Sequence, residues 1–155
     1  MSPLAKRAKP GLLFSAIVYF VAAIAGAAEN TSQTIQVKIG TILATNQGDD
    51  FDARLGPWKK QLEVMKYRSY RLLKEESQNV QRRGNATFDI PGGRSLVVTP
   101  QESGSKQLAL KVHLQQGGKP LLDTTVRLNS GGHFLLGGPP HEGGALVISI
   151  SATAQ

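Results

Sequence analysis

The chain has no cysteine and few aromatic residues. Its 155 residues include no Cys, and Phe, Trp and Tyr together make up 6%. The absence of Cys excludes disulfides, a thiolate nucleophile and thiolate metal ligands. The scarcity of aromatic rings disfavours a broad stacking platform for nucleic-acid bases. Fold and function must therefore be sought in apolar packing and in the placement of the 18 Lys and Arg residues.

The usual signatures of catalysis and of metal binding are also missing. The sequence has no Gly-x-Ser-x-Gly, no phosphate-binding GK[ST] loop and no HExxH. His113, His133 and His141 lack the spacing of zinc ligands. Ser130 lies three residues before His133, but the two glycines between them indicate a turn. We therefore predict a protein that is not an enzyme and has no cofactor and no metal.

A small acidic cluster is the nearest approach to a carboxylate site. Asp49, Asp50 and Asp52 lie in a turn-rich segment, but the spacing of a calcium-binding loop is not met. Helix-capping and turn roles suit these residues better. The alternative is a hydrolase, which would need a pocket that joins these aspartates to His133 or His141.

Residues 1–28 have the layout of a secretory signal peptide. A basic start is followed by an uncharged, largely apolar run over residues 11–28. The run ends in small residues, and Ala25-Gly26-Ala27 matches an A-x-A cleavage site. The alternative is an uncleaved anchor, because 18 residues reach the lower limit of a membrane span. Both alternatives predict an exported, periplasmic or extracellular domain over residues 29–155, with membrane contact only through an uncleaved leader.

The exported part is only mildly basic. Residues 29–155 contain 15 basic and 11 acidic residues, a surplus of four positive charges. This modest surplus and the predicted compartment both disfavour nucleic acid as a partner. With 127 residues the domain can bury enough apolar surface to fold without disulfides.

Most of residues 29–155 show the two-residue period of half-buried strands. Alternating apolar positions occur around Ile35, Phe88, Leu96, Leu110 and Val126. Pro-Gly-Gly, Gly-Gly-Lys-Pro and Ser-Gly-Gly sequences separate several of these runs and predict turns. Residues 67–74 predict a further strand, residues 137–144 (GGPPHEGG) a loop, and residues 145–151 the last strand.

One segment has the period of a helix. Leu55, Trp58, Leu62 and Met65 are spaced three, four and three residues apart and share one helical face. Pro57 suits the first turn, so we place a short helix at about residues 57–66, packed into the core through the Trp58 indole. The predicted fold is mainly β with this one helix between the first two strands, as an antiparallel β-sandwich or an open barrel.

Positive charge is concentrated in residues 54–83. This segment has nine basic and three acidic residues, whereas the rest of residues 29–155 has a net charge of −2. The segment could display one basic face towards an acidic partner, either an envelope protein or an anionic envelope polymer. The alternative is a solvated surface without a partner. The candidate partner-binding residues are Lys59, Lys60, Lys66, Arg68, Arg71, Lys74, Arg82 and Arg83.

Three stretches carry a resemblance to known proteins. YRSYRLL, FDIPGGRSLVVTP and LLDTTVRLNSGGHFLLGGPPHEGGALVISISA resemble segments of small exported bacterial envelope proteins of unknown function. The resemblance extends from about Val37 onward. It implies a cell-envelope setting and an antiparallel β-rich domain, and it brings no catalytic residues.

These observations favour one function and leave two alternatives. We expect an exported, non-enzymatic binding or scaffolding module of the cell envelope. The alternatives are a hydrolase that acts on an envelope polymer and a structural subunit of an envelope assembly.

Overall fold

The computed structural model describes residues 34–101 and 107–155. The predicted leader, residues 1–28, lies outside the described residues. The elements are β1 (Thr34–Thr45), η2 (Ala53–Trp58), α1 (Lys59–Glu63), β2 (Ser69–Gln81), β3 (Ala86–Ile90), β4 (Arg94–Gln101), β5 (Gln107–Gln116), β6 (Lys119–Asn129), β7 (Gly132–His141) and β8 (Gly144–Ala154). In this part of the chain no helix is long and apolar enough to cross a membrane.

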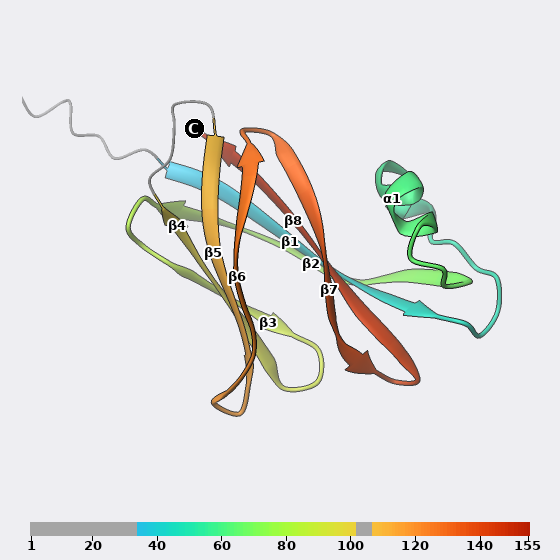
Figure 1. The fold of residues 1–155 in the computed structure, drawn as a ribbon. Helices are drawn as coiled ribbons and strands as arrows, with labels where there is room; N and C mark the ends of the chain where they lie inside the picture. Colours follow the sequence, from blue (N-terminus) through green and yellow to red (C-terminus); the bar gives the residue numbers. More distant parts are fainter. Residues whose placement is uncertain (1–33, 102–106) are drawn as a thin grey trace, which may run out of the picture. The chain divides into compact units, whose positions relative to one another are not determined.

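The eight strands form two four-stranded antiparallel sheets (Figure 1). The first sheet has the order β2-β1-β8-β7 and the second the order β3-β4-β5-β6. The sheets do not join into a closed cylinder. The predicted β-rich fold is therefore confirmed as a sandwich rather than a barrel, with the helical segment between the first two strands as expected.

The main core lies between the two sheets. Alternate residues of β1, including Ile35, Val37 and Ile39, face it from the first sheet. Phe88 and Leu110 face it from the second sheet and are at most 1% exposed. This alternation is the pattern that the two-residue period predicted.

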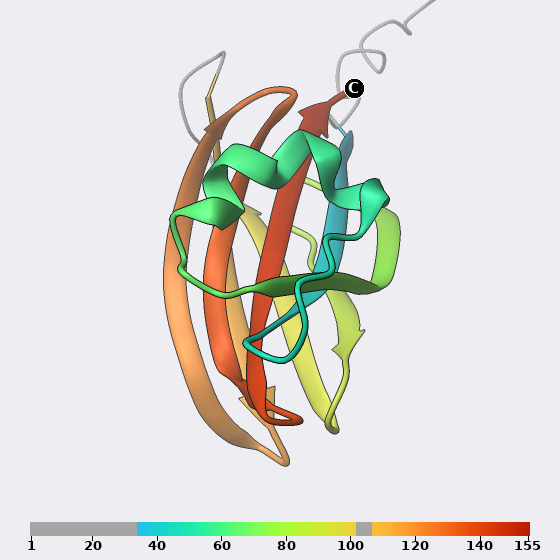
Figure 2. The same cartoon turned by 90° about the vertical axis from the view of Figure 1, so that its right-hand side faces the viewer.

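A second core lies on the opposite face of the first sheet. The helical cap, which we define as residues 53–66, lies across that sheet (Figure 2). Leu55 and Leu62 of the cap are buried against Ile42 of β1 and Val147 of β8. One end of the first sheet is thus covered on both faces.

The cap differs in detail from the predicted helix over residues 57–66. Its first turn is a 3-10 helix from Ala53 to Trp58, and only Lys59–Glu63 form an α-helix. Leu55 and Leu62 are fully buried, whereas Trp58 is only partly buried at the edge of the second core. The expectation that the Trp58 indole fills the core was therefore wrong, because Leu55 and Leu62 are the cap residues that fill it.

The predicted loop over residues 137–144 is mostly strand. β7 continues to His141, and the turn contains only Glu142 and Gly143, both with positive φ, as tight antiparallel hairpins require. β7 is an outer strand, so Pro139 and Pro140 need no partner on their free side. The register shift between Gly137 and Pro140 absorbs the two prolines.

We predict that Leu62→Ala lowers the free energy of unfolding by about 2–5 kcal/mol, because it leaves a cavity in the second core. Trp58→Ala should cost less than Leu62→Ala, because its indole is only partly buried. Val64→Ala, in the same cap, serves as the control, since Val64 is 76% exposed. Urea denaturation measures all three variants. An equal loss for Leu62→Ala and Val64→Ala would show that the cap does not pack as described.

Candidate functional site

The helical cap holds three of the eight candidate basic residues. Lys59 and Lys60 lie in α1, and Lys66 lies in the connection to β2. All three are exposed, and no ion pair involves them within the described residues. Lys59 Nζ lies 5.5 Å from the centre of the Phe51 ring. Val64, directly after the exposed Glu63 and between Lys60 and Lys66 in the chain, is 76% exposed, so the cap presents an apolar side chain in a segment that is rich in lysine.

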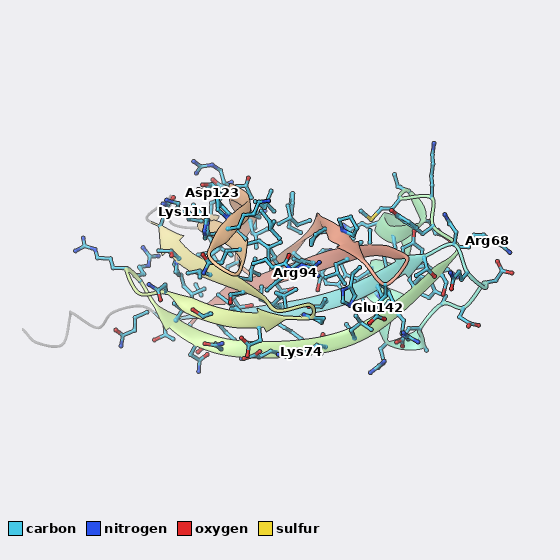
Figure 3. All side chains as sticks on the ribbon, turned by 90° about the horizontal axis from the view of Figure 1, so that it is seen from below. Arg68, Lys74, Arg94, Lys111, Asp123 and Glu142 are labelled. Carbon is cyan, nitrogen blue, oxygen red and sulfur yellow. The ribbon has the colours of Figure 1, made fainter. Side chains whose placement is uncertain are left out.

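Two other candidates are engaged in contacts within the domain. Arg68 donates hydrogen bonds of 2.9 and 3.0 Å to the two carboxylate oxygens of Asp49. Lys74 Nζ donates to the carbonyl of Asp89, at 3.1 Å, and lies 3.5 Å from Glu76 Oε1. Figure 3 shows Arg68 near the cap and Lys74 farther along the sheet.

Lys74 takes part in closing one side of the sandwich. β3 is an outer strand, and its carbonyl groups at Thr87 and Asp89 face β2. Lys74 and Gln78 of β2 donate to these carbonyls, Gln78 at 2.8 Å. The side chains thereby satisfy backbone groups that an unpaired edge would leave open.

The remaining candidates do not extend the basic surface of the cap. Arg82 and Arg83 follow the far end of β2, whose 13 residues span about 40 Å. Arg82 is partly buried, and Arg83 has positive φ in the turn before β3. Arg71 lies near the start of β2 and lines a cavity. The eight residues therefore do not form one continuous face, and among the described residues the three candidates without an ion pair in the cap are Lys59, Lys60 and Lys66.

The cavity lies at the end of β1 and has a volume of about 430 Å³. Its walls come from the loop after β1, the start of β2 and the turn between β7 and β8. The polar and aromatic residues in these walls include Gln47, Asp50, Phe51, Ser69, Arg71 and Glu142. A cavity of this volume is within the range of small-molecule sites.

Asp52 borders the cavity, but its carboxylate is fully engaged. Oδ1 accepts from Nε and the backbone N–H of Arg54, both at 3.0 Å. Oδ2 accepts from Arg54 Nη2 at 2.7 Å and from the backbone N–H of Leu72 at 3.0 Å. The Arg54 side chain, followed by these backbone N–H groups, holds the pKa of Asp52 well below its usual value. Asp52 is thus a weak base that fixes the loop to β2.

The histidines do not join the aspartates in this cavity. His133 packs edge-on against Trp58, with ring centres 4.4 Å apart, on the cap side of the first sheet. His141 lies against Arg94, and neither histidine lines the cavity. His113 is on the second sheet, 3.9 Å from Asp123. Over residues 34–101 and 107–155, no three His, Asp or Glu side chains are grouped so that they could hold a metal ion.

Sequence reasoning missed the contact that Arg94 makes between the sheets. Its guanidinium donates to the carbonyl of Pro91 at 2.9 Å and to that of Pro140 at 3.0 Å. Gly92 lies so close to this guanidinium that the Arg94 side chain would have to shift to accommodate a Cβ there. No local signal could have revealed the contact, because Pro140 lies 46 residues from Arg94.

We predict that Asp52→Asn lowers the melting temperature at neutral pH, because the amide cannot accept the same four bonds. The pKa of Asp52 is lower in the folded chain, so its stabilising contribution is present above the ordinary carboxyl value of 3.8 and is lost as the pH falls below it. The melting temperatures of the wild type and the variant should therefore converge in acid.

Asp50→Asn is the control, since no hydrogen bond or ion pair to the Asp50 side chain is found in the described residues. A gap between the wild type and Asp52→Asn that stays constant from neutral pH to pH 2, measured by thermal denaturation, would contradict the prediction.

No protein-family model matches the chain, and no curated protein does. Among solved structures, it is similar to the type II secretion system secretin XcpQ of Pseudomonas aeruginosa, with a TM-score of 0.39, 15% identity, and coverage of 80% of this chain and 56% of that chain. It is also similar to the secretin GspD of E. coli K12, with a TM-score of 0.39, 13% identity, and coverage of 80% and 49%. The chain thus spans about half the length of these secretin chains.

Proposed function

We propose that the chain is an exported, non-enzymatic module of the cell envelope that binds an acidic protein surface through its helical cap. The observation that carries the proposal is the exposure of Val64 between Lys60 and Lys66 in the chain. Solvated lysines alone need no partner. Val64 is an aliphatic side chain that is 76% exposed in the same segment, and covering it with a partner would stabilise the complex.

The composition of the cap favours a protein over an anionic polymer. The lysines at positions 59, 60 and 66 would attract acidic groups and speed the encounter. Val64 would then be buried in an apolar spot at the centre of the contact. A charged polymer offers acidic groups but little apolar surface, so it would use the lysines and leave Val64 in solvent.

The cap is also rigid enough to act as a preformed docking surface. The Tyr70 hydroxyl donates to the carbonyl of Leu62 at 2.6 Å, which fixes the end of α1 to β2. Leu55 and Leu62 anchor its inner side in the second core. Little ordering of the cap would therefore be needed on binding.

A second candidate function is that of a structural subunit of an envelope assembly. Leu121 and Phe134, which are 37% and 41% exposed, lie on β6 and β7. These are outer strands of the two sheets. An outer strand can accept a partner strand through its free backbone groups. This candidate predicts an assembly that is weakened by Phe134→Ser and unaffected by changes in the cap.

The proposal predicts that replacing Lys59, Lys60 and Lys66 by Gln weakens capture of a specific protein from envelope extract. The matched control replaces Lys111, Lys119 and Arg127 by Gln, which removes the same charge from the second sheet and should preserve capture. We expect at least about tenfold weaker binding at low salt for the cap variant, and a smaller difference at high salt.

Val64→Asn separates the two classes of partner. It should weaken binding to a protein and leave retention on a polyaspartate column unchanged. Quantitative mass spectrometry of the captured proteins provides the measurement. If every captured protein were retained equally by the cap variant and by its control, the cap would not be the docking surface.

A further inference from the structure

We propose that the cavity at the end of β1 binds a small zwitterionic ligand, an amino acid or a dipeptide with a free ammonium and a free carboxylate. The cavity can bind this ligand whether or not the cap docks a protein. Three properties of the cavity support the proposal: fixed walls, charges of both signs that do not pair with one another, and buried apolar residues in the lining.

The first wall of the cavity is held by backbone hydrogen bonds. Phe51 forms a parallel bridge with Tyr70 of β2. Within this bridge Asp52 N–H donates to the Tyr70 carbonyl at 3.0 Å, and Tyr70 N–H donates to the Asp50 carbonyl at 2.9 Å. Arg68 N–H donates to the Thr45 carbonyl at 3.0 Å. The loop is therefore preorganised, and a ligand would lose little affinity to ordering it.

The opposite wall is the turn between β7 and β8. Gly144 packs directly on the backbone of Ala44, where any Cβ would collide with the Ala44 carbonyl. This close packing holds the turn beside the end of β1 and brings Glu142 to the cavity. Figure 3 shows Glu142 and Arg94 in the same region of the domain, consistent with the contact of Arg94 with the preceding His141.

Charges of both signs line the cavity without pairing with one another. Asp50 and Glu142 carry negative charge and Arg71 carries positive charge. Among the described residues, Arg71 forms no ion pair with either carboxylate. Asp52, in contrast, is neutralised by Arg54. The Glu142 carboxylate lies 3.4 Å from Nε2 of His141. Among the described residues, Arg71 and Asp50 are therefore the lining charges without an ion pair, and Glu142 adds a second carboxylate.

This set matches the two ends of a zwitterion. A guanidinium binds a carboxylate with two parallel hydrogen bonds, so Arg71 would take the ligand's carboxylate. Asp50 and Glu142 would take its ammonium. Gln47 and Ser69, which also line the cavity, offer neutral hydrogen-bonding groups between the charged ones.

Buried apolar residues in the lining indicate an apolar side chain on the ligand. Leu43 and Tyr70 are 6% and 3% exposed, and both line the cavity together with Phe51. The volume of about 430 Å³ holds an amino acid or a dipeptide with an aliphatic or aromatic side chain.

The test uses the twenty free amino acids and the dipeptide Ala-Phe as probes, with amide chemical shifts of the folded chain as the readout. We expect at least one probe to shift the signals of Asp50, Arg71 and Glu142 in a saturable manner. The binding probe is then compared with its N-acetyl and its C-terminal amide forms, each of which should bind at least tenfold more weakly. The absence of saturable shifts with every probe would overturn the proposal.

Variants assign the two ends of the ligand. Arg71→Gln should bind the parent probe at least tenfold more weakly. It should also reduce the penalty for amidation, because the carboxylate contact is already lost. The double variant Asp50→Asn and Glu142→Gln should also bind the parent probe at least tenfold more weakly. It should reduce the penalty for acetylation, because the ammonium contact is already lost. Arg127→Gln with Asp123→Asn, on the second sheet, is the matched control and should bind like the wild type. Equal binding by the control and by both cavity variants would overturn the site.

Discussion

The first sheet buries both of its faces at one end, and the rest of the structure depends on this constraint. Residues 39–44 of β1 are all buried, because Leu43 faces the second sheet while Ile42 and Ala44 face the helical cap. A sheet with two apolar faces needs a cover on each side. The second sheet supplies one cover and the cap supplies the other. Without the cap, Ile42, Val147 and their neighbours would form an exposed apolar patch.

The same constraint explains why polar groups are concentrated at this end of the domain. The chain must leave β1, cross the sheet as the cap and return as β2, and each change of direction leaves backbone groups to satisfy. Asp52 and the Tyr70 hydroxyl satisfy them at Leu72 and Leu62. The lysines and the cavity flank these fixed points. Both proposed binding surfaces are thus consequences of how the cap is attached.

Much of the fold was predictable because apolar residues at every second position are what a strand with one buried face requires. The strands around Phe88, Leu110 and Val126 follow it, and the structure confirms them. The continuous apolar run at residues 145–148 is typical of a strand buried on both faces, but the sequence analysis predicted only a strand there and no cover for its second face. The prediction that the Trp58 indole fills the core was wrong, because spacing places a residue on a helical face but does not show how deeply that residue is buried.

The candidate site was less predictable, because closeness in the chain is not closeness in space. A count of basic residues over residues 54–83 treats a cap and a strand alike. Lys60 and Lys66 lie six positions apart in the short helical cap, whereas the extended strand β2 carries Arg82 about 40 Å away from its start. Conversely, Arg71 and Glu142 are 71 positions apart and line one cavity. A charge cluster in a sequence therefore predicts a charged face only where the chain turns within the length of the cluster.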